Sequence, residues 1–428
     1  MKSNMPRRGS IVVMVLSFAF LSVGISKDAH AVAQWARKYN VNCQTCHTAF
    51  PRLSYFGEQF KRNGYQMPET QDGDETKKKV GENKLFIDEL GNLMGIRISV
   101  TPVKVEMNQL TTNGEKKIRT SFGNPDWVQF FVAGSIFKDA SIFIEPEVQD
   151  KSIKTNWFYL GYHNILDTSL LNVKVGKLSP MDNLGQSGRL RMIPSLKIAT
   201  LADFKSGGAY AAAAQEKTLG GGITAANSTH DDEVSIESPQ PSVEVYGYQK
   251  YFLYSVGVTN GSSLSDSNEY KNFFGTLRFD IPEGPLVGSN IAGFGYLGWD
   301  TSNNSRNRQA DRFWRTAGSA NLRYDKFDVV ALFIYGKDDN WDLLTNLEQT
   351  TKGISGQVGY LISSNWFTAL QYDWVNGTDG SDNFSKVSPV LTYMPRENMR
   401  VDLGGRVDVN DTAGGRQHEG FVNIRSMF

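Results

Sequence analysis

From about residue 84 to the C-terminus, apolar and polar side chains alternate along the chain with a period of two. The pattern is clearest in residues 398–408, where one set of alternate positions is apolar and the other is charged. The apolar set includes Met399, Val401, Leu403 and Val407, and the charged set is Arg400, Asp402, Arg406 and Asp408. Because successive side chains of a strand point to opposite faces, this pattern predicts β-strands with one apolar and one charged face.

The number and spacing of these segments indicate how the strands close. About 16 strands can be placed, the second of them beginning near residue 126, and their connections alternate between tight turns and long polar stretches. Transmembrane barrels of the bacterial outer membrane have this arrangement, with short periplasmic turns and longer external loops. A soluble sandwich also alternates, but the even strand number, the connections and a last strand that ends in Phe428 favour a transmembrane antiparallel β-barrel. The predicted fold is mainly β, with a small N-terminal α-helical domain.

Charge and hydropathy narrow the class of protein further. The 45 basic and 45 acidic residues cancel, so the chain lacks the excess positive charge of a nucleic-acid-binding protein. The apolar run at residues 11–24 is shorter than the roughly 20 residues that span a bilayer as a helix. Arg7 and Arg8 precede this run, and Ala-His-Ala at residues 29–31 follows it. We therefore expect residues 1–31 to be a cleaved export signal, with an uncleaved anchor helix as the alternative.

The cysteines give the most specific chemical signal. The chain has two cysteines, and both lie in Cys43-Gln44-Thr45-Cys46-His47, the spacing for covalent attachment of a c-type haem. The two thiols can form thioethers with both haem vinyl groups, and the adjacent histidine becomes the proximal iron ligand. A thioredoxin-like pair, a zinc site and a structural disulfide are the alternatives. The first lacks a βαβ context, the second lacks further ligands, and the third gives His47 no role. We predict one covalently attached haem c.

Short helical segments flank this motif. Trp35 and Tyr39 lie four residues apart on a predicted upstream helix, so their side chains face the same side. Leu53, Phe56 and Phe60 mark one face of a predicted downstream helix. An apolar wall of this kind would keep a haem dry.

The sixth iron ligand is less constrained by the sequence. Gly64 is predicted to end the downstream helix in a left-handed cap. Met67 follows in a loop that can fold over the open face of the haem, where a thioether ligand would raise the reduction potential. An ordinary loop methionine is the alternative. Met94, Met107 and His163 are the reserve candidates, whereas His230 and His418 are predicted to be solvated or wall residues.

The remaining segments define the domain boundaries. Residues 32–68 are predicted to form the monohaem cytochrome domain, residues 69–83 a polar linker, and residues 84–428 the barrel. Residues 180–239 are the main irregularity, because they are either two further short strands or one external loop folded into the pore.

Several motifs of the chain are similar to those of a known protein family. The chain resembles the fused monohaem cytochrome-porins of Gram-negative iron-oxidising bacteria, and the resemblance covers the mature chain. The motifs that carry it are Cys43-x-x-Cys46-His47, Pro51-x-Leu53, Gly57-x-x-Phe60 and Gly64-Tyr65, followed by a porin-like barrel ending in Phe428. The resemblance implies a protein of the outer membrane that oxidises extracellular Fe(II) and passes the electron through its haem to a periplasmic c-type cytochrome or other carrier. It implies an iron:cytochrome c oxidoreductase in which Cys43, Cys46 and His47 hold the haem, with Met67 as a candidate iron ligand.

This resemblance leads to a structural hypothesis. One haem is much shorter than the hydrophobic band of about 25 Å that a barrel spans, so residues 32–68 are predicted to plug the lumen. Acidic loop residues, among them Asp231, Asp232 and Glu233, can attract Fe(II) through oxygen ligands, although a solvated patch is the simpler interpretation.

Two other functions fit the same sequence. In the first, the barrel is a solute-conducting porin whose haem domain is a plug or sensor. In the second, the haem takes electrons from a donor other than Fe(II), such as an extracellular cytochrome or a solid surface.

Overall fold

The computed structural model describes most of the chain beyond its first 32 residues. The described residues are 33–49, 51–73, 78–79, 86–109, 116–149, 152–187, 193, 234–261, 269–301, 310–341, 347–377, 384–410 and 416–428. The predicted export signal, His230 and the acidic residues 231–233 lie outside them. No helix among the described residues is long and apolar enough to cross a membrane.

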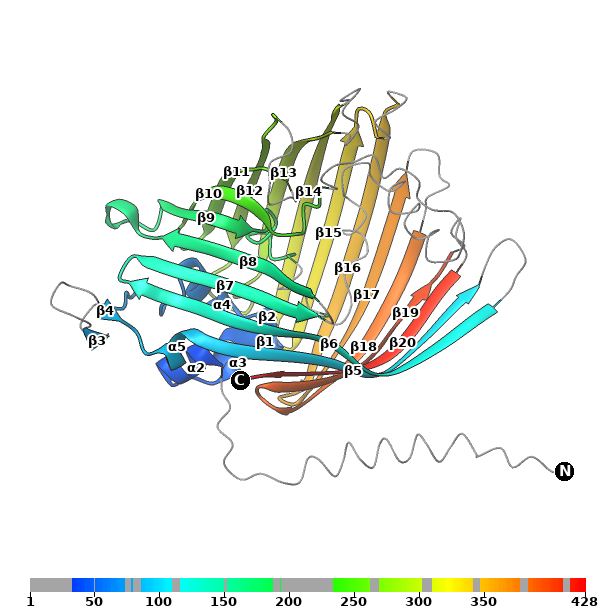
Figure 1. Cartoon of the computed structure of the whole chain (residues 1–428), viewed down its shortest axis with the longest axis horizontal. Helices are drawn as coiled ribbons and strands as arrows, with labels where there is room; N and C mark the ends of the chain where they lie inside the picture. Colours follow the sequence, from blue (N-terminus) through cyan, green and yellow to red (C-terminus); the bar gives the residue numbers. More distant parts are fainter. Residues whose placement is uncertain are drawn as a thin grey trace.

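Sixteen antiparallel strands of the described chain close into a barrel (Figure 1). They follow one another in sequence order from β5 to β20, and β20 pairs with β5 to complete the cylinder. The strands are β5 (Met94–Gln109), β6 (Lys116–Phe137), β7 (Ala140–Gln149), β8 (Ser152–Tyr162), β9 (Asn172–Leu178), β10 (Gln240–Tyr248), β11 (Phe252–Thr259), β12 (Asn272–Asp280), β13 (Asn290–Thr301), β14 (Ala310–Tyr324), β15 (Phe327–Asp338), β16 (Gln349–Ser363), β17 (Trp366–Gly377), β18 (Phe384–Arg396), β19 (Met399–Asp408) and β20 (Arg416–Met427). The prediction of a mainly-β chain with a sixteen-strand antiparallel barrel is confirmed.

The period-two pattern separates the lumen from the outer face. On β12, Phe273, Leu277 and Phe279 are about half exposed on the outer face, whereas Arg278 and Asp280 are buried on the inner face. An apolar outer band with a polar interior is the arrangement of a transmembrane barrel. The strand at residues 399–408 follows the same pattern. Arg400 and Asp402 are buried in the lumen, where they form an ion pair at 2.5 Å.

One strand is longer than its sequence pattern predicts. β6 begins at Lys116, ten residues before the predicted start at residue 126, and its first part pairs with residues 103–109 of β5. Lys117 and Arg119 alternate there with Ile118 and Thr120, but residues 116–120 are exposed, and Gly-Asn-Pro at residues 123–125 is typical of a turn. Backbone pairing with β5 carries the strand through this sequence, so the turn-forming residues hid its true start.

The connections define two different ends of the barrel. Two-residue connections join strands at residues 138–139, 325–326, 364–365 and 397–398, and these four lie at one end because the strands alternate in direction. We call this the short-turn end and the opposite one the long-loop end. The connection between β7 and β8 is equally short but lies at the long-loop end, with the longer loops. Phe428 also lies at the short-turn end, where its backbone exchanges hydrogen bonds of 2.8 and 3.0 Å with Ile96 of β5. In outer-membrane barrels the short turns face the periplasm.

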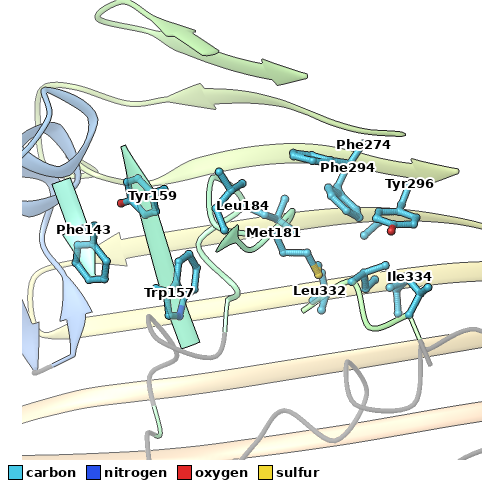
Figure 2. Packing of buried hydrophobic residues seen from close by; sticks show 14 of the residues in the cluster. Phe143, Trp157, Tyr159, Met181, Leu184, Phe274, Phe294, Tyr296, Leu332 and Ile334 are labelled. Atoms are coloured by element: carbon cyan, nitrogen blue, oxygen red, sulfur yellow. The ribbon is translucent and has the colours of Figure 1, made fainter. Parts of the chain in front are cut away.

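The segment that follows β9 folds into the lumen. Met181 and Leu184 are buried against inward-facing residues of the wall, between Tyr159 on one side and Phe294 on the other (Figure 2). Asn183 donates a hydrogen bond of 2.7 Å to the carboxylate of Glu244 on the inner face of β10. Of the two interpretations of residues 180–239, the described part therefore supports a segment folded into the pore.

A charge on the outer face of β12 tests the position of the lipid band. Leu277→Arg places a guanidinium near the middle of the strand, where burial in hydrocarbon costs about 2–4 kcal/mol. We expect this loss in the free energy of unfolding of the protein in liposomes, measured by denaturant titration. The same charge introduced in the β12–β13 turn, as Glu283→Arg, should change stability little. Equal effects of the two variants would contradict the assignment.

Candidate functional site

The candidate site lies in the N-terminal domain, which is built from small elements. These are α2 (Gln34–Tyr39), α3 (Cys43–Cys46), β1 (His47–Ala49), β2 (Arg52–Leu53) and α4 (Tyr55–Arg62). The rings of Trp35 and Tyr39 each make an edge contact with Phe60, with centroids 5.6 Å apart, so the predicted shared face of the upstream helix is confirmed.

The downstream helix begins later than its apolar pattern suggests. Leu53 was expected on this helix, but it lies on β2 opposite His47. The helix starts after Ser54, whose hydroxyl accepts a hydrogen bond of 3.1 Å from the backbone of Gly57. A serine in this position satisfies an amide that has no partner within the helix, and it therefore fixes the helix start.

The end of α4 is the left-handed turn that Gly64 predicts. Gly64 has a φ of +67°, and the Tyr65 amide donates back to the Phe60 carbonyl at 3.0 Å. This bond closes a Schellman motif. A Cβ at Gly64 would also lie 2.4 Å from the ring of His163, so both backbone conformation and space require glycine.

The domain occupies the mouth of the barrel at the short-turn end, near the C-terminus (Figure 1). The Cys43 amide donates a hydrogen bond of 2.8 Å to the Glu397 carboxylate in the β18–β19 turn. On another side, the Gln66 side chain donates to the Lys138 carbonyl at 3.0 Å in the β6–β7 turn. Asp72 contacts Lys38 at 2.5 Å, so the polar contacts of the domain continue past residue 68.

A buried ion network joins α4 to the inner wall. Glu58 pairs with Arg278 of β12, with Arg323 of β14 at 3.2 Å and with Arg62 at 3.7 Å. Arg62 also binds Asp280 at 2.8 Å. A second link runs from the domain to β15, where Arg52 binds Asp328 at 3.0 Å.

The network determines the charge state of Glu58. Burial alone would disfavour the ionised carboxylate, but Arg278, Arg323 and Arg62 outweigh it and hold the pKa of Glu58 well below its usual range. The carboxylate is therefore charged at any neutral or mildly acidic pH, and it holds three guanidinium groups that would otherwise repel one another.

The cysteines and the histidine of the motif present their reactive atoms in one place. Cys43 and Cys46 are free thiols that are partly buried, and burial raises the pKa of each to about 11. His47 is half-buried, and the desolvation of its ring lowers its pKa to about 4 and keeps the imidazole neutral. Its Nδ1 lies 3.3 Å from the Pro51 carbonyl. Because a carbonyl only accepts, Nδ1 carries the proton in this contact and the lone pair is on Nε2.

Two cavities adjoin these residues. Both are partly open to solvent. The larger has about 710 Å³ of space outside the atoms, open solvent included, and is lined by Cys46 and His47 together with Trp35, Phe60, Tyr65, Phe131 and Phe143, among others. The smaller has about 420 Å³ on the same measure and is lined by both cysteines, His47, Tyr39, Phe56 and Met67, among others. Trp35 stacks on Tyr65 beside the larger cavity, with ring centroids 4.7 Å apart.

The candidate sixth ligands differ in where the structure places them. Met67 lines the smaller cavity with Cys43, Cys46 and His47, and its carbonyl is held by the Asn63 side chain at 2.8 Å. The structure therefore brings the residues predicted for the haem site to one cavity.

The reserve candidates lie elsewhere. Met94 is 47% exposed at the start of β5, and Met107 lies toward the long-loop end of the same strand. His163 is buried with both ring nitrogens hydrogen-bonded, to Ser141 at 2.6 Å and to Tyr246 at 2.9 Å. His163 therefore braces the turn after β8, and His418 lies on β20 in the wall.

Sequence reasoning missed the barrel residues that line the larger cavity. Arg97 of β5 and Met427 of β20 contribute to it with Phe131 and Phe143. No local motif marks them, because strand closure brings them to the N-terminal domain from distant parts of the chain.

These residues fit a covalently bound haem. The two thiols have the required spacing on α3, and the contact of His47 Nδ1 with the Pro51 carbonyl fixes the tautomer and ring orientation that a metal-binding histidine needs. Apolar side chains predominate around the adjoining cavities, as a haem requires. When bound, such a group would supply a one-electron couple at its iron.

Comparisons with known proteins bear on the barrel. No protein-family model matches the chain, and no curated protein matches it. Among solved structures, the chain is similar to the anion-selective porin from Comamonas acidovorans, with a TM-score of 0.56 and 11% identity over 78% of this chain and 99% of that one. It is also similar to DcaP, an outer membrane channel of Acinetobacter baumannii (TM-score 0.52, 13% identity, 78% and 97% covered). OmpF of Salmonella typhi, solved in complex with daunomycin, gives 0.52 and 14% identity with the same coverage.

The fold defines the class of protein. A closed sixteen-strand barrel over the described residues, with an apolar outer face and the fold of these porins, is an outer-membrane porin-like barrel. Its location is the outer membrane of a Gram-negative bacterium.

A substitution at Gly57 tests how closely α3 packs against α4. A Cβ at this position would lie 2.1 Å from the Cys46 carbonyl oxygen, so Gly57→Ala forces the two helices apart. We expect a loss of about 1–3 kcal/mol, the usual cost of overpacking, seen as faster trypsin cleavage within the N-terminal domain of the folded barrel. At Gly91 an added Cβ meets no atom within 4 Å, so Gly91→Ala is the matched control. Equal cleavage rates of the two variants would refute this packing.

Proposed function

We propose that this protein is an outer-membrane electron-transfer protein that oxidises extracellular Fe(II) and passes the electron to a periplasmic carrier through one haem c. The observation that carries the proposal is the position of the Cys43-x-x-Cys46-His47 motif. It lies in a domain held in the short-turn mouth, beside cavities lined mainly by apolar side chains. In this position a redox group would lie between the lumen and the periplasm.

The residues of the chain have separate tasks in this proposal. Cys43 and Cys46 attach the haem, and His47 is held by the Pro51 carbonyl as a neutral ligand to the iron. Trp35, Phe60 and other apolar side chains exclude water from the site. Each extracellular Fe(II) gives up one electron to become Fe(III), and one electron passes to the oxidised periplasmic carrier.

A groove at the short-turn mouth supports a periplasmic partner. It has about 1730 Å³ of open space and runs between α4 and the turns that precede β9, β11 and β13. Phe56 lines both this groove and the smaller cavity beside the cysteines, so one side chain separates the groove from the candidate haem site. We propose that a periplasmic c-type cytochrome or another small carrier takes the electron here.

Carboxylates at the long-loop end support a cationic donor. Asp300, Asp311 and Asp338 are fully buried on the inner face of β13, β14 and β15. Arg315 binds Asp338 at 2.8 Å, and the backbone amides of Thr301 and Asn340 donate to Asp300 and Asp311 at 2.8 and 2.9 Å. Acidic groups around the lumen at this end contribute a negative potential, which would draw a cation such as Fe(II) toward it. In the part of the chain that is described, no group of three or more His, Cys, Asp or Glu side chains is arranged to hold a metal ion. We therefore assign these carboxylates a role in attraction rather than in chelation.

Stopped-flow absorption spectroscopy tests the donor. The haem-loaded protein is mixed with Fe(II) without oxygen, and we expect rapid reduction of the haem. With Met67→Ala we expect a lower reduction potential and an altered spectrum, because loss of a thioether ligand destabilises the reduced state. Haem that stays oxidised in excess Fe(II) would overturn the iron assignment. Unchanged spectrum and potential in the variant would remove Met67 from the iron.

A solute-conducting porin is the second candidate, and the fold shared with porins favours it. An open barrel of sixteen strands leaves an aqueous channel. In this chain the N-terminal domain and the segment after β9 lie inside the barrel, anchored by buried ion pairs. The two candidates therefore differ in whether the short-turn mouth conducts ions.

Conductance through the protein in planar bilayers distinguishes the electron-transfer protein from the solute-conducting porin. Under the electron-transfer proposal the parent conducts far less than an open porin, and Glu58→Gln raises conductance because three arginines lose their shared carboxylate. Breaking a buried ion pair costs about 3–5 kcal/mol. Glu283→Gln, in an exposed turn, is the control. A parent that conducts like an open porin would support the second candidate.

Glu58 also determines how conductance through the short-turn mouth depends on pH. Its lowered pKa means that its stabilising contribution is complete above the unfolded-state value of about 4.3 and is lost only as the pH falls through the folded-state value. We therefore expect the parent to stay closed at pH 4. Opening between pH 5 and pH 4 would contradict the role of Glu58.

A further inference from the structure

The larger cavity beside His47 is formed by two parts of the molecule. Lys61 and Tyr65 line it from the N-terminal domain, whereas Arg97, Phe131 and Met427 line it from the barrel wall. The barrel therefore contributes side chains to the site where the motif would hold its haem.

The charged side chains that line this cavity are both cations. Lys61 and Arg97 are each 8% exposed, and each has an acidic partner outside the lining, Asp182 at 2.9 Å for Lys61 and Glu145 at 3.3 Å for Arg97. The other lining residues are uncharged and mostly apolar. A cavity of this kind suits an amphipathic ligand with a large apolar body and anionic groups at its edge. A haem has this chemistry, since it carries two propionate carboxylates.

Arg97 is held in place from several directions. Its guanidinium lies over the rings of Trp127 and Phe131, 5.1 Å from each centroid. Gln129 accepts a hydrogen bond of 2.7 Å from its Nε, and Glu145 accepts one of 3.3 Å from its Nη2. Because aromatic faces and neighbouring acceptors fix the guanidinium, its position is set before any ligand binds, and an anion that contacts it loses little conformational entropy in doing so.

We propose that Arg97, together with Lys61, binds the haem propionates, so that the barrel wall completes the cofactor site. The proposal rests on the proposed function, because it assumes that the motif carries a haem. It adds that the cofactor bridges the N-terminal domain and β5, so haem loading and docking of the domain support each other. A cation beside the propionates stabilises the reduced iron and raises the reduction potential.

Spectroelectrochemical titration of the haem-loaded full-length protein tests this assignment without Fe(II). For Arg97→Gln we expect the equilibrium constant for haem reduction to fall about tenfold, which is about 59 mV for a one-electron couple. Arg97→Lys should keep part of the effect. Arg315→Gln removes another buried lumenal arginine, which is paired with Asp338 near the long-loop end, and should leave the potential unchanged. Heat-modifiable gel migration confirms that each barrel is folded.

Glu145, the ion-pair partner of Arg97, requires a separate control. Loss of the arginine removes the positive charge that compensates the buried Glu145 carboxylate. Arg97→Gln/Glu145→Gln removes both charges. If Arg97 contacts the propionates, the double variant keeps a lowered potential, and the propionate-bending band in its resonance Raman spectrum is shifted from that of the parent. A double variant with the parent's potential and spectrum would show that Arg97 acts only as the ion-pair partner of Glu145. That result would overturn the proposal.

The two proposals fail in different ways. A covalent haem that does not react with Fe(II) would end the iron assignment, whereas the titration would still decide the role of Arg97. A parent protein without covalent haem would overturn both.

Discussion

The arrangement of this protein depends on one buried carboxylate. Glu58 lies on α4 of the N-terminal domain and pairs with Arg278 and Arg323 of the barrel wall and with Arg62 of its own helix. Without that charge, several guanidinium groups would face one another in a space from which water is largely excluded. Because breaking such a network by removing one partner is costly, the domain is held in the mouth as part of the barrel. The positions of the Cys43-x-x-Cys46-His47 motif, the two cavities and the groove all follow from this anchorage.

Because the N-terminal domain is anchored at the short-turn end, the two ends of the barrel carry different chemical groups. The long-loop end carries inward carboxylates, and the motif lies at the short-turn end. Between them Met181 and Leu184 pack against one part of the wall (Figure 2). A metal ion that reaches the lumen from outside would meet a redox group only near the inner mouth, and a periplasmic protein could approach that group through the groove beside Phe56. This order suits transfer of electrons inward while the oxidised metal stays outside.

Local rules predicted a large part of the structure from the sequence. Period-two alternation identified the strands because each faces lipid on one side and the lumen on the other, and Gly64 predicted the end of α4 because only glycine readily adopts its backbone conformation. The same rules placed Leu53 on a helix, where the Ser54 cap excludes it, and they missed the start of β6, which depends on pairing with β5. Arg97 and Met427 could not be found at all. Their place beside His47 results from barrel closure, and no spacing in the sequence encodes it.

The most direct test of the central claim is electron transfer across a membrane. The haem-loaded protein is reconstituted into sealed liposomes that contain oxidised cytochrome c and a colour-forming Fe(II) chelator, and Fe(II) is added outside without oxygen. Our account predicts reduction of the enclosed cytochrome while the chelator stays colourless, and neither change in liposomes with a His47→Ala protein. Coloured chelator, or an enclosed cytochrome that stays oxidised with the parent protein, would contradict an inward path for electrons through a closed barrel.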